Sequence, residues 1–265
     1  KKKRDRLLAL LKEYKKCAVA FSSGVDSTYL LYEAHSVLGD GCIAFTASSA
    51  TFPKKERKES EDFCKKLGVR QIFLETDELS HEDYYSNPKD RCYYCKSIIF
   101  SGIKEAARKE GIDIICEGSN MDDMGDYRPG MRAIEELGIK SPLKEAGLYK
   151  AEIRALSKRA RLSTFDKPSF ACLASRIPYG ERITHEKLSM VEAGEEYLSG
   201  LGLMQYRVRT HGDIARIEVL EEDVKIFFVP KVREKLCEYF HSIGYTYVTL
   251  DLDGFRSGSM NKGIK

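Results

Sequence analysis

The segment DRCYYCK, residues 90–96, carries two cysteines, Cys92 and Cys95, with two tyrosines between them. A CxxC pair is typical of zinc sites and of thiol redox chemistry, and two thiolates at this spacing can hold one metal centre. A third cysteine, Cys172, lies far along the chain in ACLASR. The spacing leaves three interpretations of the pair open: half of a zinc site, a redox pair and an inert pair. A fourth zinc ligand could come from His81 or Cys116, although neither lies at a zinc-like spacing from the pair.

The other five of the eight cysteines lie in apolar or amphipathic patterns. We expect them to be small buried hydrophobic residues rather than reactive groups. Three lie in runs typical of strands and two in helical patterns: Cys17, Cys42 and Cys116, then Cys64 and Cys237.

The segment SSGVDS, residues 22–27, follows a short apolar run and begins a helical pattern. Ser22, Ser23 and Gly24 are small, and Gly24 can adopt conformations that let a ligand approach the backbone. N–H groups at a helix N-terminus bind anions, and the serine hydroxyls, that of Ser27 included, add donors. The pattern favours a phosphate site, although an ordinary helix start with a Ser or Asp cap has the same composition.

A second polar segment, EGSNMDDMGDYRPG, residues 117–130, follows the fourth expected strand. Asp122, Asp123 and Asp126 are candidate Mg²⁺ ligands, because hard cations bound to phosphates prefer carboxylates and water. An acidic, glycine-rich turn is the alternative. The sequence has no GxxxxGK[ST] pattern, which argues against transfer of a γ-phosphate.

The elements that position these residues alternate in the first half of the chain. Near-continuous apolar strands separated by helices predict a parallel sheet covered on both faces, a doubly wound α/β domain. Loops after the carboxyl ends of such strands form the ligand site. The expected strands are residues 17–22, 42–47, 70–76 and 112–118, and the N-terminus is expected to be an amphipathic helix.

The second half has a different pattern. Residues 164–183 contain three prolines and no periodicity, which is typical of a functional segment. A helix, a hairpin around HGD, a second helix and a strand then predict a small α+β domain. Arg207 and Arg209 fall on one face of a strand, with Glu218 on its partner, which suits contact with a phosphate; a solvated strand face is the alternative interpretation of this pair. We therefore expect three parts: 1–163, a linker 164–183 that carries Cys172, and 184–265.

Charge and hydropathy exclude several classes of protein. The net charge is +3, which does not favour a nucleic-acid partner. The longest apolar runs are too short to cross a bilayer, and no segment near the start resembles a signal peptide. Eight cysteines without such a signal predict a reducing, cytoplasmic location.

The motif SSGVDS resembles the SGGxDS signature of the PP-loop ATP pyrophosphatases, with Ser23 in place of the usual second glycine. This superfamily includes GMP synthetase, NAD synthetase and several tRNA-thiolating enzymes. The chain resembles most closely the LarE family, ATP-dependent sulfur transferases of nickel-pincer nucleotide synthesis, over about residues 15–261. Four segments carry that likeness: NPKDRCYYCK, GSNMDDMGDYRPG, KPSFACLASRIPYGERIT and LDLDGFRSGSMN.

The resemblance implies a reaction and a set of site residues. ATP is cleaved between its α and β phosphates, a carboxylate of a pyridinium dicarboxylate mononucleotide is adenylated, and a thiocarboxylate is formed. Cys172 and Asp26 are implied in catalysis. The implied ATP site comprises Ser22, Ser23, Gly24, Asp26, Ser27, Gly118 and Asp123; the Mg²⁺ ligands are Asp123 and Asp126; and the substrate site comprises Ser175, Arg176, Arg207 and Arg209.

The family also implies two ways to supply sulfur. Either Cys172 gives up its own sulfur, or three cysteines hold a 4Fe–4S cluster with an open iron. Because the chain has Cys92 and Cys95 as well as Cys172, we expect the cluster. A tRNA thiolase and a nucleotide-binding regulatory module with structural zinc are the alternative functions, and the family suggests a homo-oligomer assembled through the small domain.

Overall fold

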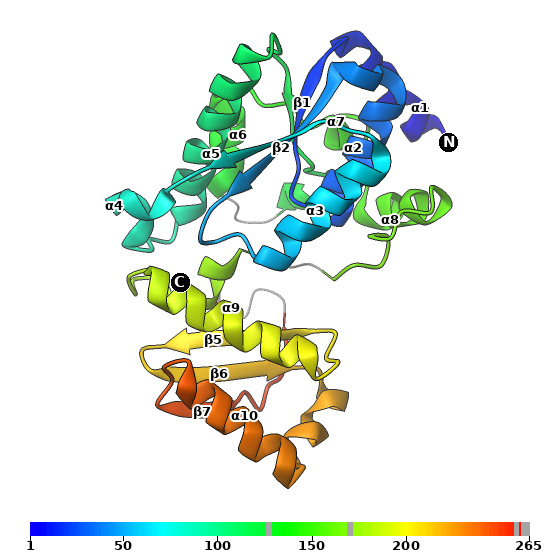
Figure 1. Cartoon of the computed structure of the whole chain (residues 1–265). Helices are drawn as coiled ribbons and strands as arrows, with labels where there is room; N and C mark the ends of the chain where they lie inside the picture. Colours follow the sequence, from blue (N-terminus) through cyan, green and yellow to red (C-terminus); the bar gives the residue numbers. More distant parts are fainter. Residues whose placement is uncertain (126–128, 169–171, 257–259, 261–265) are drawn as a thin grey trace. The chain divides into compact units, whose positions relative to one another are not determined.

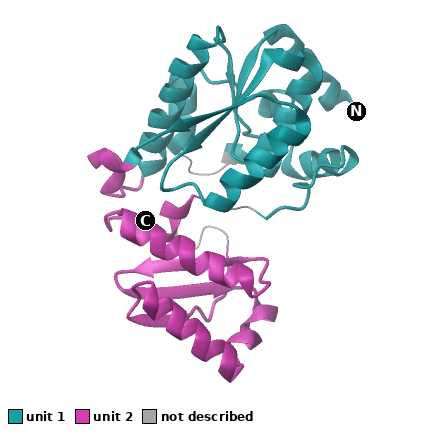
Figure 2. Ribbon diagram, in the orientation of Figure 1, with its two compact units in different colours: residues 1–78, 90–170 teal, residues 79–89, 171–265 magenta. Residues whose placement is uncertain are grey.

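The computed structural model describes residues 1–125, 129–168, 172–256 and 260. The chain forms two compact units (Figure 2). The first comprises residues 1–78 and 90–170, and the second comprises residues 79–89 and 171–265. The chain therefore passes from one unit to the other three times, after residues 78, 89 and 170.

A four-stranded sheet forms the centre of the first unit, in the order β3-β2-β1-β4. All neighbouring strands are parallel, which confirms the predicted doubly wound α/β fold. The strands are β1 (Cys17–Ala20), β2 (Cys42–Ser48), β3 (Gln71–Glu75) and β4 (Ile115–Cys116). β4 is shorter than expected, because the N–H of Glu117 bonds to Lys140 O at 2.9 Å rather than extending the ladder with β1.

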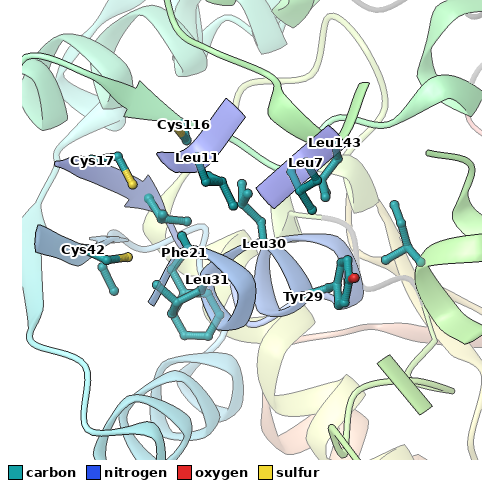
Figure 3. Packing of buried hydrophobic residues seen from close by; sticks show 14 of the residues in the cluster. Leu7, Leu11, Cys17, Phe21, Tyr29, Leu30, Leu31, Cys42, Cys116 and Leu143 are labelled. Carbon is teal, nitrogen blue, oxygen red and sulfur yellow. The ribbon is translucent and has the colours of Figure 1, made fainter. Parts of the chain in front are cut away.

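Five helices contribute to the core on one face of this sheet: α1 (Lys2–Tyr14), α2 (Val25–Leu38), α3 (Lys54–Leu67), α7 (Pro142–Glu145) and α8 (Lys150–Arg159). Leu7 and Leu11 of α1 lie fully buried against α2 (Figure 3), which confirms the amphipathic N-terminal helix. Three cysteines of the strands, Cys17, Cys42 and Cys116, point into the same core.

The other face is covered by α5 (Arg91–Lys109) and α6 (Pro129–Glu136) (Figure 1). Phe100 and Ile103 of α5 and Ile134 of α6 pack with Phe45 of β2. The helix α5 begins at Arg91, before the point at which its apolar pattern starts, so it includes both cysteines of the CxxC pair.

The second unit contains a three-stranded sheet in the order β5-β6-β7. The expected hairpin is confirmed by β5 (Tyr206–His211) and β6 (Ile214–Val219), which pair antiparallel, while β7 (Tyr247–Leu250) lies parallel to β6. Gly194 lets α9 (His185–Gly200) approach α10 (Pro230–Ser242), because a Cβ there would lie 3.1 Å from the Phe240 ring and 3.3 Å from the Val208 side chain.

The short segment 79–89 belongs to the second unit and contains α4 (Glu82–Tyr85). Asn87 attaches this segment to the loop 178–181 of that unit. The Asn87 amide donates to the carbonyls of Pro178 and Glu181 at 2.6 and 3.0 Å. The N–H of Ile183 donates to Tyr85 O at 2.8 Å. Nothing in the sequence pattern of residues 79–89 predicted this assignment.

The remaining short helical turns are η1 (Gly39–Gly41), η2 (Glu78–Ser80), η3 (Met121–Gly125), η4 (Leu173–Arg176) and η5 (Glu221–Phe228). Within the described residues, no helix is long and apolar enough to span a membrane.

Candidate functional site: a phosphate loop and a buried arginine cluster

The candidate phosphate loop connects β1 to α2 at the carboxyl edge of the sheet. Strand order reverses at β1, since β2 and β3 follow on one side and β4 lies on the other. Such a switch point is where doubly wound folds bind their ligands. The loop is internally bonded: Thr28 N donates to Gly24 O at 2.9 Å, and the hydroxyls of Ser22 and Ser27 lie 3.1 Å apart.

Gly118 brings the segment after β4 against this loop. A Cβ at Gly118 would lie 3.0 Å from the backbone N of Ser27 and 3.3 Å from the Asp26 Cβ. Real Cβ atoms essentially never approach closer than this. The structure therefore brings together Gly118, Asp26 and Ser27, three of the residues expected at the ATP site, and the absence of a side chain at Gly118 is what lets them meet.

The unusual backbone conformation of the loop lies at Ser23 rather than at Gly24. Gly24 has a φ of −76°, which any residue adopts, whereas Ser23 has a φ of 58° in the left-handed region. Gly24 therefore does not use a conformation reserved for glycine, and its expected role in letting a ligand approach the backbone stays a prediction. The loop is open on the side of Gly24, because even a Cβ at this position would come no closer than 3.5 Å to any neighbouring side chain.

Asp26 lies at the start of α2 and forms a short ion pair with Lys150. Burial raises the pKa of the Asp26 carboxyl, Lys150 opposes that rise, and Asp123 adds to it by repulsion. The Oδ1 atom of Asp26 is buried and has no hydrogen-bond partner among the described residues. An unsatisfied carboxylate oxygen in reach of a second carboxylate is suited to a cation or to the water of a hydrated cation.

Two carboxylates of the acidic segment after β4 accept hydrogen bonds from nearby backbone N–H groups. Asp123 accepts from Asn120 N at 2.8 Å, and Asp122 accepts from Lys150 N at the start of α8 at 2.7 Å. Asp126, the other predicted Mg²⁺ ligand, lies outside the described residues. Assignment of Mg²⁺ to Asp123 and Asp126 stays a prediction.

Sequence reasoning missed two lysines beside the loop, Lys150 and Lys167. Lys150 is the first residue of α8, where a cation is unfavourable next to the positive end of the helix dipole; that misfit was a signal for a carboxylate partner. Lys167 lies in the quoted motif KPSFACLASR and its ammonium donates to Ser23 O at 3.0 Å.

The CxxC pair occupies the first turn and a half of α5. Cys92 is exposed and Cys95 is half-buried. Three residues apart on a helix, their side chains project from the same face. Because the pair begins a helix, both the metal-centre and redox interpretations remain physically reasonable.

The third cysteine, Cys172, is exposed and immediately precedes η4 in the second unit. Among the described residues, no group of three or more Cys, His, Asp or Glu side chains is gathered into a metal site within either unit. Since Cys92 and Cys95 belong to the first unit and Cys172 to the second, the shared cluster stays a prediction.

The four core cysteines have a different character. Cys17, Cys42, Cys64 and Cys116 are all buried, which confirms the expectation for them, while Cys237 is half-buried. Burial raises the pKa of the Cys64 thiol to about 12. A buried thiol that stays protonated is a poor nucleophile and a poor ligand, so the exposed cysteines are the better candidates for sulfur chemistry.

The predicted substrate residues gather in the second unit around a buried set of charges. Arg176 binds Glu195 through two hydrogen bonds of 2.8 Å, with the arginine 1% exposed. Arg176 also donates to the Ser175 hydroxyl at 2.9 Å. Arg209 donates to Ser175 O at 3.0 Å and to Glu218 at 2.9 Å. We call these residues, with Arg207, Arg216 and Asp251, the arginine cluster.

Arg207 and Arg209 are both 5% exposed, so a solvated strand face, the alternative interpretation of this pair, is wrong. Burial lowers the pKa of Arg207 to about 10, and repulsion by Arg176 and Arg209 adds to that shift. In the cluster four arginines face three carboxylates, Glu195, Glu218 and Asp251. An anion brought to Arg207 would relieve this excess of positive charge.

Comparison with known proteins decides the family. A pyridinium-3,5-bisthiocarboxylic acid mononucleotide synthase of Lactiplantibacillus plantarum is 38% identical over 260 residues, 98% of this chain and 94% of that protein. The chain belongs to the LarE family. An uncharacterized protein of Synechocystis matches to the same 38% over 98% of this chain and 97% of its own length. No family model matches the chain.

A more distant relative supports the PP-loop assignment. One subunit of the glutamine-hydrolysing GMP synthase of Methanocaldococcus jannaschii is 26% identical over 194 residues, which is 66% of this chain and 60% of that subunit. The LarE family assignment and the four-stranded parallel sheet with its β1–α2 loop agree with this PP-loop relationship. The predicted superfamily and fold are thereby confirmed.

Proposed function

We propose that this chain is an ATP-dependent sulfur transferase that converts carboxylates of a pyridinium dicarboxylate mononucleotide into thiocarboxylates. The observation that carries the proposal is the near full-length identity to the mononucleotide synthase. Two features of the chain support it: the ligand-ready loop at the switch point of a PP-loop sheet and the arginine cluster around Arg207.

The first chemical step is adenylation. A substrate carboxylate oxygen attacks the α-phosphorus of ATP, the bond from that phosphorus to the bridging oxygen breaks, and pyrophosphate leaves. The product is an acyl–AMP mixed anhydride. We propose that N–H groups at the start of α2, with the Ser22 and Ser27 hydroxyls, bind the phosphates. We propose that Asp26 and Asp123 hold a hydrated Mg²⁺ on those phosphates, as the unsatisfied Asp26 Oδ1 allows.

The second step is transfer of sulfur. A sulfur nucleophile attacks the acyl carbon, the carbon–oxygen bond to AMP breaks, and AMP leaves with that electron pair. The product is a thiocarboxylate. We propose that the arginine cluster holds the substrate's own phosphate during both steps. Arg207 is the favoured contact, because neighbouring arginines already repel its charge.

For the sulfur source we propose a 4Fe–4S cluster held by Cys92, Cys95 and Cys172. Such a cluster with one iron free of protein ligands would supply an extra sulfide for delivery. Each cysteine group lies close to a point where the chain changes unit: Cys92 is three residues after residue 89, and Cys172 is two residues after residue 170.

The reaction is tested by its products. Purified protein with ATP, Mg²⁺ and the dicarboxylate mononucleotide should release AMP and pyrophosphate. Asp26→Ala should lose pyrophosphate release, whereas Asp113→Ala, at a residue outside the loop, should not. ADP as the main product would show that the phosphate-loop assignment is wrong.

The sulfur source is tested under anaerobic conditions by iron and sulfide analysis of single variants. Cys92→Ala, Cys95→Ala and Cys172→Ala should each lose the cluster and repeated turnover, and Cys237→Ala, a half-buried cysteine of α10, should keep both. If Cys172 instead donates its own sulfur, Cys92→Ala stays active, each chain delivers one sulfur, and Cys172 loses the mass of hydrogen sulfide.

Substrate contact is tested separately from ATP contact. Arg209→Ala removes a charged donor, a loss of about 1.5–3 kcal/mol for a bond to a charged partner. Affinity for the mononucleotide should fall tenfold or more while ATP affinity is kept. Equal loss of both affinities would place the substrate phosphate elsewhere.

We also propose that the chain forms a homo-oligomer through residues 184–265. The edge strand β7 carries Tyr247, which is 59% exposed, and Leu252 just after it is 97% exposed. Light scattering of the intact chain and of a Leu252→Asp variant tests this assembly. A monomer at all concentrations would refute it.

A further inference from the structure

Lys167 makes four polar contacts through one ammonium group, and two of them are to the phosphate loop. Its Nζ donates to Ser23 O at 3.0 Å and to Ser23 Oγ at 3.1 Å. It also donates to Glu56 at 2.6 Å and to Glu59 at 2.5 Å. The lysine side chain is 13% exposed, so this is a built contact rather than a passing surface pair.

Ser23 has a reason to need support. Its φ of 58° lies in the left-handed region, which costs free energy for any residue with a side chain because Cβ approaches the carbonyl oxygen. Such a conformation persists only where the surroundings over-determine it. Lys167 binds both the carbonyl and the hydroxyl of Ser23, and the hydroxyl also hydrogen-bonds Glu56. Both polar ends of this one residue are held by these neighbours.

Lys167 is itself held from two sides. Arg154 of α8 donates to Phe165 O at 2.8 Å and to Lys167 O at 2.9 Å, which fixes the backbone. Glu56 of α3 lies 7% exposed beside the ammonium. Burial raises the pKa of Glu56, against which Lys167 and the Ser23 hydroxyl lower it. The Glu56 carboxylate stays beside Lys167 although its burial is unfavourable, and it orients the Lys167 ammonium towards the loop.

We propose that Lys167 is a positioning residue that holds Ser23 in its left-handed conformation and so presets the phosphate loop for ATP. The hydroxyl of Ser23 then serves as an anchor for Lys167 and Glu56 rather than as a phosphate donor. This inference rests on the proposed function only in that the loop binds ATP.

The competing role is direct contact between the ammonium and a phosphate. The two roles differ in how they depend on residue 23. A glycine adopts the left-handed region without the Cβ penalty, so a loop with glycine at position 23 needs no brace. A direct phosphate contact would be equally valuable with either residue.

A double-mutant cycle separates these roles. Ser23→Gly, Lys167→Met and the double variant are compared for affinity toward a non-hydrolysable ATP analogue, with thermal unfolding as a check on folding. We expect Lys167→Met to lower affinity tenfold or more relative to wild type, and Lys167→Met in the Ser23→Gly background to lower affinity less than threefold relative to Ser23→Gly alone. Lys109→Met, which removes an exposed lysine paired with Glu105, is the control and should change nothing.

Each other outcome has a meaning. The same loss in both backgrounds overturns the proposal and assigns Lys167 to the phosphate. No loss in either background also overturns it. If Lys167→Met does not fold, Lys167→Gln, whose uncharged side chain is one bond shorter than that of lysine, replaces it, and the same dependence on residue 23 is required. Failure of the wild-type chain to bind the analogue would instead contradict the proposed function.

Discussion

Replacement of Gly118 by alanine should damage the phosphate loop through one added methyl group. The new Cβ would lie 3.0 Å from the Ser27 backbone N and 3.3 Å from the Asp26 Cβ. Neither neighbour is the flexible end of a side chain, so the start of α2 must move. Overpacking of this kind costs about 1–3 kcal/mol. The displaced Ser27 N–H is one of the groups proposed to bind phosphate.

Two measurements follow from that displacement. Thermal unfolding should shift down by several degrees, since about 1 kcal/mol corresponds to roughly 2–4 °C for domains near this size. ATP affinity should fall tenfold or more, which is about 1.4 kcal/mol of binding free energy. Affinity for the mononucleotide should stay unchanged, because the arginine cluster is in the other unit.

Gly102→Ala is the matched control within the same unit. Gly102 lies inside α5, and a Cβ there would meet nothing within 4 Å. A glycine inside a helix costs about 0.5–1 kcal/mol relative to alanine, so this variant should be slightly more stable and bind ATP normally. If Gly118→Ala has the unfolding temperature and the ATP affinity of the wild type, the close approach of the two loops is not what forms the site.

Three further predictions concern charge. Glu195→Gln leaves the buried Arg176 without its carboxylate and should destabilise the protein by roughly 3–5 kcal/mol, whereas Glu105→Gln, at an exposed ion pair, should leave stability close to that of the wild type; equal effects would contradict the buried pair. Burial raises the pKa of Glu56, so the stability that its protonated form contributes is present at low pH and is lost as pH rises through that pKa. Glu56→Gln should therefore unfold at a higher temperature than the wild type near about pH 8 and lose this advantage near about pH 4. A difference in unfolding temperature that stays constant with pH would refute the assignment. EDTA should abolish ATP binding but spare mononucleotide binding, and ATP binding that survives EDTA would exclude Mg²⁺ from the loop.

Much of the first unit could be predicted from sequence because its elements have strong local patterns. The run CIAFTA predicted a strand within one residue of β2, and Gly68 ends α3 in the left-handed conformation typical of a helix stop. The start of α5 is hard to see in the sequence, because the polar residues around Cys92 carry no helical periodicity. The apolar contacts that a pattern reports begin only further along that helix.

The rest could not be predicted because it depends on residues that meet only after folding. Lys150 and Asp26 are 124 residues apart, and Lys167 and Ser23 are 144 apart. The arginine pair of β5 alternated as a solvated strand face would, and contacts with residues distant in the sequence, such as Ser175 and Phe255, help to bury it. In each case a charged residue was visible in the sequence but its partner was not.

Under the proposed function the two units recognise phosphate by different chemistry, and this difference follows from how their cations are used. Beside the loop, Lys150 is paired with Asp26, and Lys167 with Glu56 and Glu59. Neither lysine brings uncompensated positive charge, so a polyphosphate there depends on backbone N–H groups and on a divalent cation to balance its charge. The described residues of the arginine cluster comprise four arginines and three carboxylates, and the phosphate contact proposed there needs no metal. We propose that the loop releases pyrophosphate once the bond has broken, because no fixed excess of positive charge retains it, while the mononucleotide stays bound through adenylation and sulfur transfer.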